Sequence, residues 1–184
     1  MKFHIETERL ILRELQPSDA DAFFEMDSNA EVHKYLGNNP VKVIEHIHDV
    51  IANVRQQYLD NGIGRWAMIE KSSGNFIGWS GLKYMQQTTN GKINFHEVGY
   101  RLLQKHWGKG YATESAKAAV NYGFEEMKLN EIYGITNVEN INSRKVLEKC
   151  GLTFIETFVW EGWNNIECNW LKITKEEWEN RNTY

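Results

Sequence analysis

Hydrophobic and polar positions alternate along the chain with two different periods, and the changes of period mark the expected elements. Strand-like patterns cover residues 9–13, 66–70, 76–82, 97–102, 131–138, 154–160 and 166–173. Apolar residues recur at helical spacing in residues 18–26, 44–61, 111–128 and 142–150. Strands joined by turns pair antiparallel, whereas a helix between two strands makes them parallel neighbours. The order predicts an α/β fold with a single mixed, mostly antiparallel sheet flanked by helices.

Several polar residues predict where the helices begin and end. Ser18 is placed to cap the first helix, and Asp19 in its first turn favours the helix dipole. Asn61 and Gly62 close the longer second helix. Residues 174–177 have the spacing of a capping box and predict a final helical turn.

The stretch from Glu97 to Glu114 combines a strand, a Gly-rich loop and the start of a helix. The loop contains Gly108 and Gly110, and glycines let a ligand approach the backbone closely. The start of a helix presents unpaired N–H groups and the positive end of its dipole. This stretch therefore predicts a site for a phosphate-bearing ligand at the helix that begins near Tyr111.

Two common phosphate-binding loops do not match this stretch. A Walker A loop needs Lys-Ser or Lys-Thr after its second glycine, but Tyr111 follows Gly110. The dinucleotide fingerprint needs a third glycine where this chain has Thr113. A strand-to-helix turn that uses glycine only for its geometry remains an alternative at this point.

Composition limits the class of protein. The 184 residues suit one domain, residues 1–184, and the net charge of −4 gives no global support for nucleic-acid binding. The two cysteines, Cys150 and Cys168, form no disulfide framework and suit a reducing compartment. The first residues lack a long apolar run, so we expect no signal peptide, and no apolar run in the sequence is long enough to span a membrane. We therefore expect a cytoplasmic protein.

The central stretch resembles the acetyl-CoA motif of the GNAT acetyltransferases, whose core loop reads Arg/Gln-x-x-Gly-x-Gly/Ala. Residues 97–100 followed by residues 107–114 are similar to the RimJ/RimL branch of that family. Lys105 stands at the Arg/Gln position, which is a departure from the motif. The order of elements also resembles the GNAT fold over nearly the whole chain.

This resemblance implies acetyl-CoA as the acetyl donor and assigns residues to it. The backbone amides of the loop would hold the pyrophosphate, and they belong to Gly108, Lys109, Gly110, Tyr111, Ala112 and Thr113. The backbone of Leu102 and Leu103 would pair with the pantetheine arm. Asn140 would contact the same arm, although its position alone favours an ordinary helix cap.

The resemblance also implies the catalytic groups. Glu97 would be the general base, acting directly or through water, and the alternative is a structural ion pair with Arg101 on the same strand face. Many GNAT enzymes have a tyrosine where Leu147 stands, and it protonates the leaving thiolate. Ser143 or a water would replace it here.

Other polar and aromatic residues carry less weight. His46 and His48 lie on opposite sides of a helix, so we expect solvated histidines and no metal site. Cys150 occupies an apolar helical position and is expected to be buried and structural. Trp160 and Trp163 are candidates for lining an acceptor pocket.

Together these residues predict an N-acetyltransferase that moves acetyl from acetyl-CoA to a primary amine by direct attack in a ternary complex. The acceptor would be a protein N-terminal α-amine or a small-molecule amine, and the protein a monomer or homodimer. An α-amine, with a pKa of about 7.7–8.0, needs less help from a base than a lysine amine at about 10.4. The alternative is a noncatalytic acyl-CoA-binding sensor or interaction module.

Overall fold

A single eight-stranded sheet forms the centre of the computed structural model, which describes residues 4–161 and 165–182. The strand order is β1-β2-β3-β4-β5-β6-β8-β7. The strands are β1 (His4–Glu6), β2 (Leu10–Glu14), β3 (Trp66–Glu70), β4 (Phe76–Met85), β5 (Phe95–Leu102), β6 (Glu131–Asn137), β7 (Thr153–Trp160) and β8 (Ile166–Thr174). All neighbouring strands pair antiparallel except β5 and β6, which are parallel.

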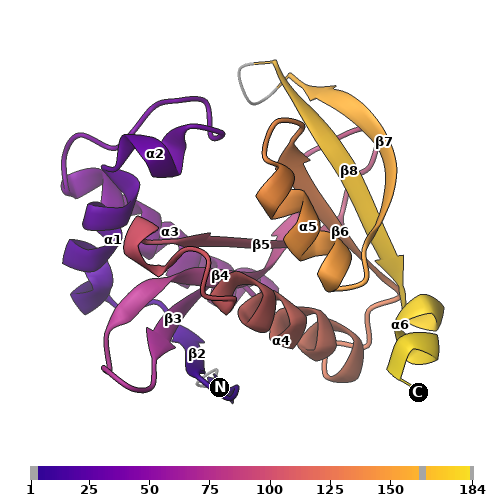
Figure 1. Cartoon of the computed structure of the whole chain (residues 1–184), viewed down its shortest axis with the longest axis horizontal. Coiled ribbons are helices and arrows are strands. Elements are labelled where there is room, and N and C mark those ends of the chain that lie inside the picture. The colour runs from indigo at the N-terminus through magenta and orange to yellow at the C-terminus, as the bar shows by residue number, and fades with distance from the viewer. Residues whose placement is uncertain (1–3, 162–164, 183–184) are drawn as a thin grey trace.

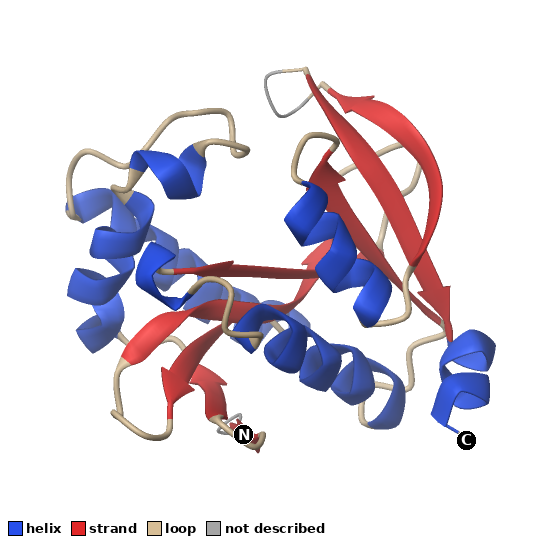
Figure 2. Cartoon of the chain, in the orientation of Figure 1, coloured by secondary structure: helices blue, strands red, loops and turns tan. Residues whose placement is uncertain are grey.

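Helices cover both faces of the sheet (Figures 1 and 2). They are α1 (Ala20–Asp27), α2 (Ala30–His33), α3 (Glu45–Asn61), α4 (Tyr111–Glu125), α5 (Ile141–Lys149) and α6 (Lys175–Asn182), with short 3-10 turns η1 (Pro17–Asp19) and η2 (Gln104–His106). One core cluster joins α4 and α5 to the sheet, and a second joins α1 and α3 to the opposite face. The predicted fold class is therefore confirmed.

Two short elements and one helix start differ from the sequence-based prediction. The strand β1 and the helix α2 were not predicted, because three or four residues are too few to show a period. At the first helix, Ser18 is not the cap. Asp19 accepts a hydrogen bond from the N–H of Gln16 at 2.8 Å and pairs with Arg13 at 2.7 Å, so it organises this helix start.

The strands β5 and β6 pair over only a short distance. Their register joins Glu97 with Tyr133 and Val98 with Gly134, and beyond these pairs the two strands diverge (Figure 2). The N–H of Leu103 donates to the carbonyl of Ile77 at 3.0 Å, on the β4 side. Since peptide groups alternate in direction along a strand, those of residues 100 and 102 point toward the side where β5 and β6 diverge.

Among the described residues, no helix has the length and apolar character needed to span a membrane.

Candidate active site

The Gly-rich loop leads from η2 into the first turn of α4. Gly108 and Gly110 have φ angles of +72° and +83°, a region that favours glycine. The N–H of Glu114 donates to the carbonyl of Gly110 at 3.0 Å and makes the first bond of the helix. The amides of Tyr111, Ala112 and Thr113 therefore have no acceptor within the helix, as expected for the first turn. The loop has the local geometry of an anion site.

An arginine between β1 and β2 holds this loop in place. Arg9 donates to the carbonyl of Lys109 at 2.8 Å and to the carboxylate of Glu114 at 2.7 Å. Its guanidinium also lies 4.5 Å from the ring centre of Tyr111. Glu114 accepts a further hydrogen bond from Thr7 at 2.6 Å. Contacts from the start of the chain thus fix the loop, although sequence reasoning gave Arg9 no role at the site.

The end of β5 has only part of its backbone open to a ligand. The N–H of Leu103 is already bonded to Ile77, and the carbonyl of Leu102 accepts from the indole N–H of Trp107 at 3.0 Å. The N–H of Leu102 points away from β4, to the side where β5 and β6 diverge. Of the two leucines predicted to contact the pantetheine arm, Leu102 is the better placed.

The second predicted cofactor segment begins α5 beside β5. The side chain of Asn140 accepts from the N–H of Ser143 at 3.1 Å, so Asn140 is the helix cap. Tyr100, on β5, donates to the carbonyl of Ser143 at 2.7 Å and has its hydroxyl 3.1 Å from the Ser143 Oγ. Leu147 is buried farther along the helix. Ser143 and Tyr100 therefore form a hydroxyl pair between α5 and the strand.

The hydroxyl of Tyr100 is protonated at any ordinary pH. Burial raises its pKa well above the usual range, and this effect outweighs the hydrogen bond with Ser143, which lowers the pKa. A protonated phenol can hold the Ser143 carbonyl and orient the Ser143 hydroxyl. The sequence did not reveal this role, because Tyr100 occupies an inward position of an alternating strand and fits the pattern of a core residue.

Glu97 lies on the opposite face of β5, which we call the acceptor face; it carries Glu97, Gly99 and Arg101. The carboxylate pairs through Oε2 with Arg65, and both side chains are about nine-tenths buried, at 12% and 11% exposure. Arg65 also donates to the backbone carbonyl of Glu97 at 2.8 Å. The predicted alternative partner was wrong, since Arg101 pairs with Asp27 at 2.8 Å.

Gly99 makes room for this arginine. Gly81 on β4 stands opposite Gly99 on β5, so the acceptor face has no side chain at either position. A Cβ on Gly99 would lie 2.6 Å from a guanidinium nitrogen of Arg65. The guanidinium therefore lies directly on the sheet, donates to the carbonyl of Gly81 and stays 5.4 Å from the ring centre of Trp79. Arg65 is a second site residue that sequence reasoning missed.

An aromatic cluster continues the acceptor face beyond Glu97. Tyr133, the β6 partner of Glu97, packs with Phe95 and Trp170, with ring centres 4.8–5.2 Å apart. Trp160 packs against this cluster, whereas Trp163 lies outside the described residues. The cluster places apolar surface next to the carboxylate.

The remaining sequence candidates have structural or solvent roles. His46 and His48 are exposed. Cys150 is buried in the core, and burial raises the pKa of its thiol to about 12, so it is not a nucleophile at neutral pH.

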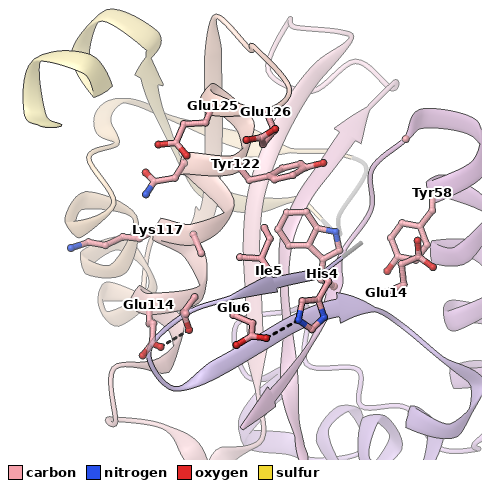
Figure 3. A pocket seen from close by; sticks show the side chains of 15 residues that line it. His4, Ile5, Glu6, Glu14, Tyr58, Glu114, Lys117, Tyr122, Glu125 and Glu126 are labelled. Carbon is pink, nitrogen blue, oxygen red and sulfur yellow. Dashed lines mark hydrogen bonds and ion pairs between the residues drawn. The ribbon is translucent and has the colours of Figure 1, made fainter. Parts of the chain in front are cut away.

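A groove of about 920 Å³ lies between β1 and α4 (Figure 3). Its lining includes Glu6, Glu14, Lys117 and Tyr122, and neither Glu97 nor the Gly-rich loop contributes to it. The groove meets the candidate active site only at Thr7 and Glu114, which also take part in the contacts that hold the loop.

Comparison with known proteins places this arrangement in a family. Residues 9–153 match the model of an acetyltransferase (GNAT) domain. The uncharacterized N-acetyltransferase p20 of Bacillus licheniformis is 35% identical over 77% of both chains. The FsC-acetyl coenzyme A-N(2)-transacetylase of Aspergillus fumigatus is 33% identical over 95% of this chain and 77% of its own.

The fold is similar to that of a solved structure. The acetyltransferase (GNAT family) from Bacillus anthracis superposes with a TM-score of 0.78 at 26% identity, and the match covers 95% of this chain and 99% of the other. With a motif, a fold and a family model in agreement over most of its length, the chain belongs to the GNAT family and is an acetyl-CoA-dependent N-acetyltransferase.

Proposed function

We propose that this enzyme acetylates the primary amine of a protein N-terminus or of a small molecule, by direct attack on acetyl-CoA in a ternary complex. The divergence of β5 and β6 after Val98 carries the proposal. It leaves strand backbone unpaired between the Gly-rich loop at one end and the two candidate catalytic positions, Glu97 and Ser143, on either side. A thioester bound there would have a polar group on each face of the strand.

In this proposal each half of the donor has its own part of the chain. The amides from Gly108 to Thr113 bind the pyrophosphate, where the helix dipole and unpaired N–H groups favour negative charge. The N–H of Leu102 bonds to the pantetheine arm, and the amide group of Asn140 that is not used in capping reaches the same arm. Tyr100 supplies the backbone N–H group nearest the thioester carbonyl, since its peptide group points to the diverging side.

The proton transfers follow from the same arrangement. The amine nitrogen attacks the thioester carbon, the carbon–sulfur bond breaks, and an amide and a CoA thiolate form. The amine loses one proton to Glu97, whose Oε2 is held by Arg65, so Oε1 takes the proton directly or through a water. The thiolate gains one proton from the Ser143 hydroxyl, which Tyr100 orients, and Ser143 then takes a proton from solvent water.

The acceptor that fits best has an amine of low pKa. An α-amine has a pKa of about 7.7–8.0, so roughly a tenth is neutral at pH 7, whereas a lysine amine at about 10.4 is almost fully protonated. The resemblance to the RimJ/RimL branch supports a protein N-terminus. The name of the Aspergillus fumigatus relative, a transacetylase for FsC, supports a small-molecule amine.

The test is the release of CoA thiol by the enzyme with peptides that have free α-amines. The buried thiols of Cys150 and Cys168 leave the background low. In Glu97→Gln we expect kcat to fall by about 10²–10⁴-fold, the usual contribution of a general base, while the Kd for acetyl-CoA stays unchanged.

The rival function is a noncatalytic acyl-CoA-binding module. It predicts tight acetyl-CoA binding with no amine-dependent thiol release, and no effect of Glu97→Gln on any rate. An enzyme that transfers acetyl equally well with Gln at position 97 would refute the role of the carboxylate but keep the activity.

A further inference from the structure

The acceptor face has a regular arrangement of side chains, and one positive charge in it lacks a partner among the described residues. The register of β4 and β5 places Trp79 opposite Arg101, Gly81 opposite Gly99 and Lys83 opposite Glu97. Directly opposite residues of neighbouring strands point to the same face. Lys83 therefore stands beside the candidate base, on the strand next to it.

The other cations of this region have partners. Arg101 is neutralised by Asp27 at 2.8 Å, and Arg65 by Glu97. Within the part of the chain that the structure describes, the ammonium of Lys83 has neither a hydrogen bond nor an ion pair within 4.0 Å. One charge is thus left over next to Glu97.

This ammonium is half-buried, and that makes the missing partner costly. Burial lowers the pKa of Lys83, and the charge of Arg65 lowers it further, against the opposing effect of Glu97. An anion bound beside Lys83 would offset both unfavourable effects.

Positive charge is also in excess farther along the face. Lys92 and Lys172 lie 2.7 and 3.8 Å from the same carboxylate, that of Glu131. The ammonium of Lys92 lies 4.9 Å from the ring centre of Tyr133, next to Glu97 in the sheet. This local excess contrasts with the net charge of −4 of the whole chain.

We propose that Lys83 binds a carboxylate of the acceptor, so that the substrate is a primary amine with an anionic group a few bonds from the reacting nitrogen. This inference rests on the proposed function and narrows its substrate class. Opposite Cβ atoms on neighbouring strands are about 4.5–5.5 Å apart. An amine at Glu97 and a carboxylate at Lys83 therefore belong to one short segment, such as an N-terminal peptide with an acidic second residue.

The same charges disfavour polyamines. A second ammonium a few bonds from the reacting amine would lie beside Lys83 and Arg65, where like charges repel. The proposal thus separates anionic amines from polycationic ones.

The experiment uses two peptide amides with the same α-amine, Ser-Asp-Phe and Ser-Asn-Phe, which differ only by a carboxylate in place of a carboxamide. With the full-length enzyme we expect kcat/KM to be roughly 10- to 100-fold higher for the acidic peptide, the size of a hydrogen bond to a charged group. In Lys83→Met this preference disappears, and in Lys83→Glu it shifts toward Ser-Lys-Phe. The control Lys117→Met removes a lysine from the α4 groove (Figure 3) and keeps the preference.

The two proposals fail in different ways. Equal kcat/KM values for the two peptides, or a preference that survives Lys83→Met, would overturn carboxylate recognition while transfer itself continues. A loss of kcat for all acceptors alike in Lys83→Met would also overturn it, because it would make Lys83 part of the chemistry. If no peptide is acetylated, the affinities of the same two peptides for the CoA-loaded enzyme are measured by calorimetry. Equal affinities, or no binding of either peptide, would overturn carboxylate recognition by Lys83.

Discussion

Replacing Gly108 with leucine tests the donor loop most directly. At a φ of +72° a non-glycine residue costs about 1–2 kcal/mol. A Cβ on Gly108 meets nothing within 4 Å, so the leucine side chain is accommodated within the fold but enters the space in front of the loop. We expect the variant to fold and to lose affinity for acetyl-CoA.

The chain contains a matched control at Gly91. This glycine has a φ of +71° and lies in the turn between β4 and β5, and a Cβ added to it would also meet nothing within 4 Å. Gly91→Leu should therefore carry the same backbone cost without touching the donor loop. Both variants should melt about 2–8 °C below the wild type, since 1 kcal/mol shifts Tm by about 2–4 °C for a chain of this size.

Only the binding measurements should differ. Losing one or two charge-assisted hydrogen bonds to a phosphate costs about 1.5–3 kcal/mol each, so Gly108→Leu should raise the Kd for acetyl-CoA at least roughly tenfold in isothermal titration. Gly91→Leu should bind like the wild type. If the two variants bound acetyl-CoA equally, whether tightly or weakly, the loop would not be the pyrophosphate site.

Three further predictions test the surroundings of the site. In Tyr100→Phe, Ser143 loses the hydroxyl that orients it, and kcat should fall roughly tenfold or more with an unchanged Kd for acetyl-CoA. An unaffected kcat in steady-state assays would exclude this role of Tyr100. Arg65→Met leaves the carboxylate of Glu97 without its partner and should cost about 3 kcal/mol in urea unfolding, part of which Glu97→Gln should restore in the double variant. Burial raises the pKa of Glu114, but hydrogen bonds from Thr7 and Arg9 outweigh it and hold the pKa below 4.5. The Glu114 carboxylate should therefore contribute roughly 1 kcal/mol to the free energy of unfolding above pH 4.5, and this contribution should disappear as the pH falls through its lowered pKa. The Glu114→Gln variant should not show this loss.

The order of elements was predictable because each strand and helix is long enough to repeat its pattern. The strand of Glu97 alternates over several residues, and α4 keeps an apolar side over four turns. The hairpin of β3 and β4 follows from the turn around Gly74. The two elements that were not predicted, β1 and α2, depend on contacts with distant residues, because each is too short to show a repeating hydrophobic pattern.

The site was predictable only where it follows the local chain. The Gly-rich loop and the start of α4 are contiguous, so the motif alone located them. Arg9 and Glu114 are 105 residues apart, and no local pattern indicates that the residue before β2 holds the loop. What the motif could not provide is the set of contacts that keeps the loop in one conformation.

The ion pair of Glu97 shows why sequence reasoning fails at the acceptor face. Period two puts Glu97 and Arg101 on one face of the strand, and that inference is correct as far as it goes. The choice of partner depends on the register between β4 and β5, which brings Gly81 opposite Gly99 and leaves room for a side chain from elsewhere. Arg65 fills that room, and Arg101 turns to Asp27 instead. The same register leaves Lys83 as the unpaired charge of this face among the described residues, so the substrate preference proposed for this enzyme follows from strand pairing and not from any motif.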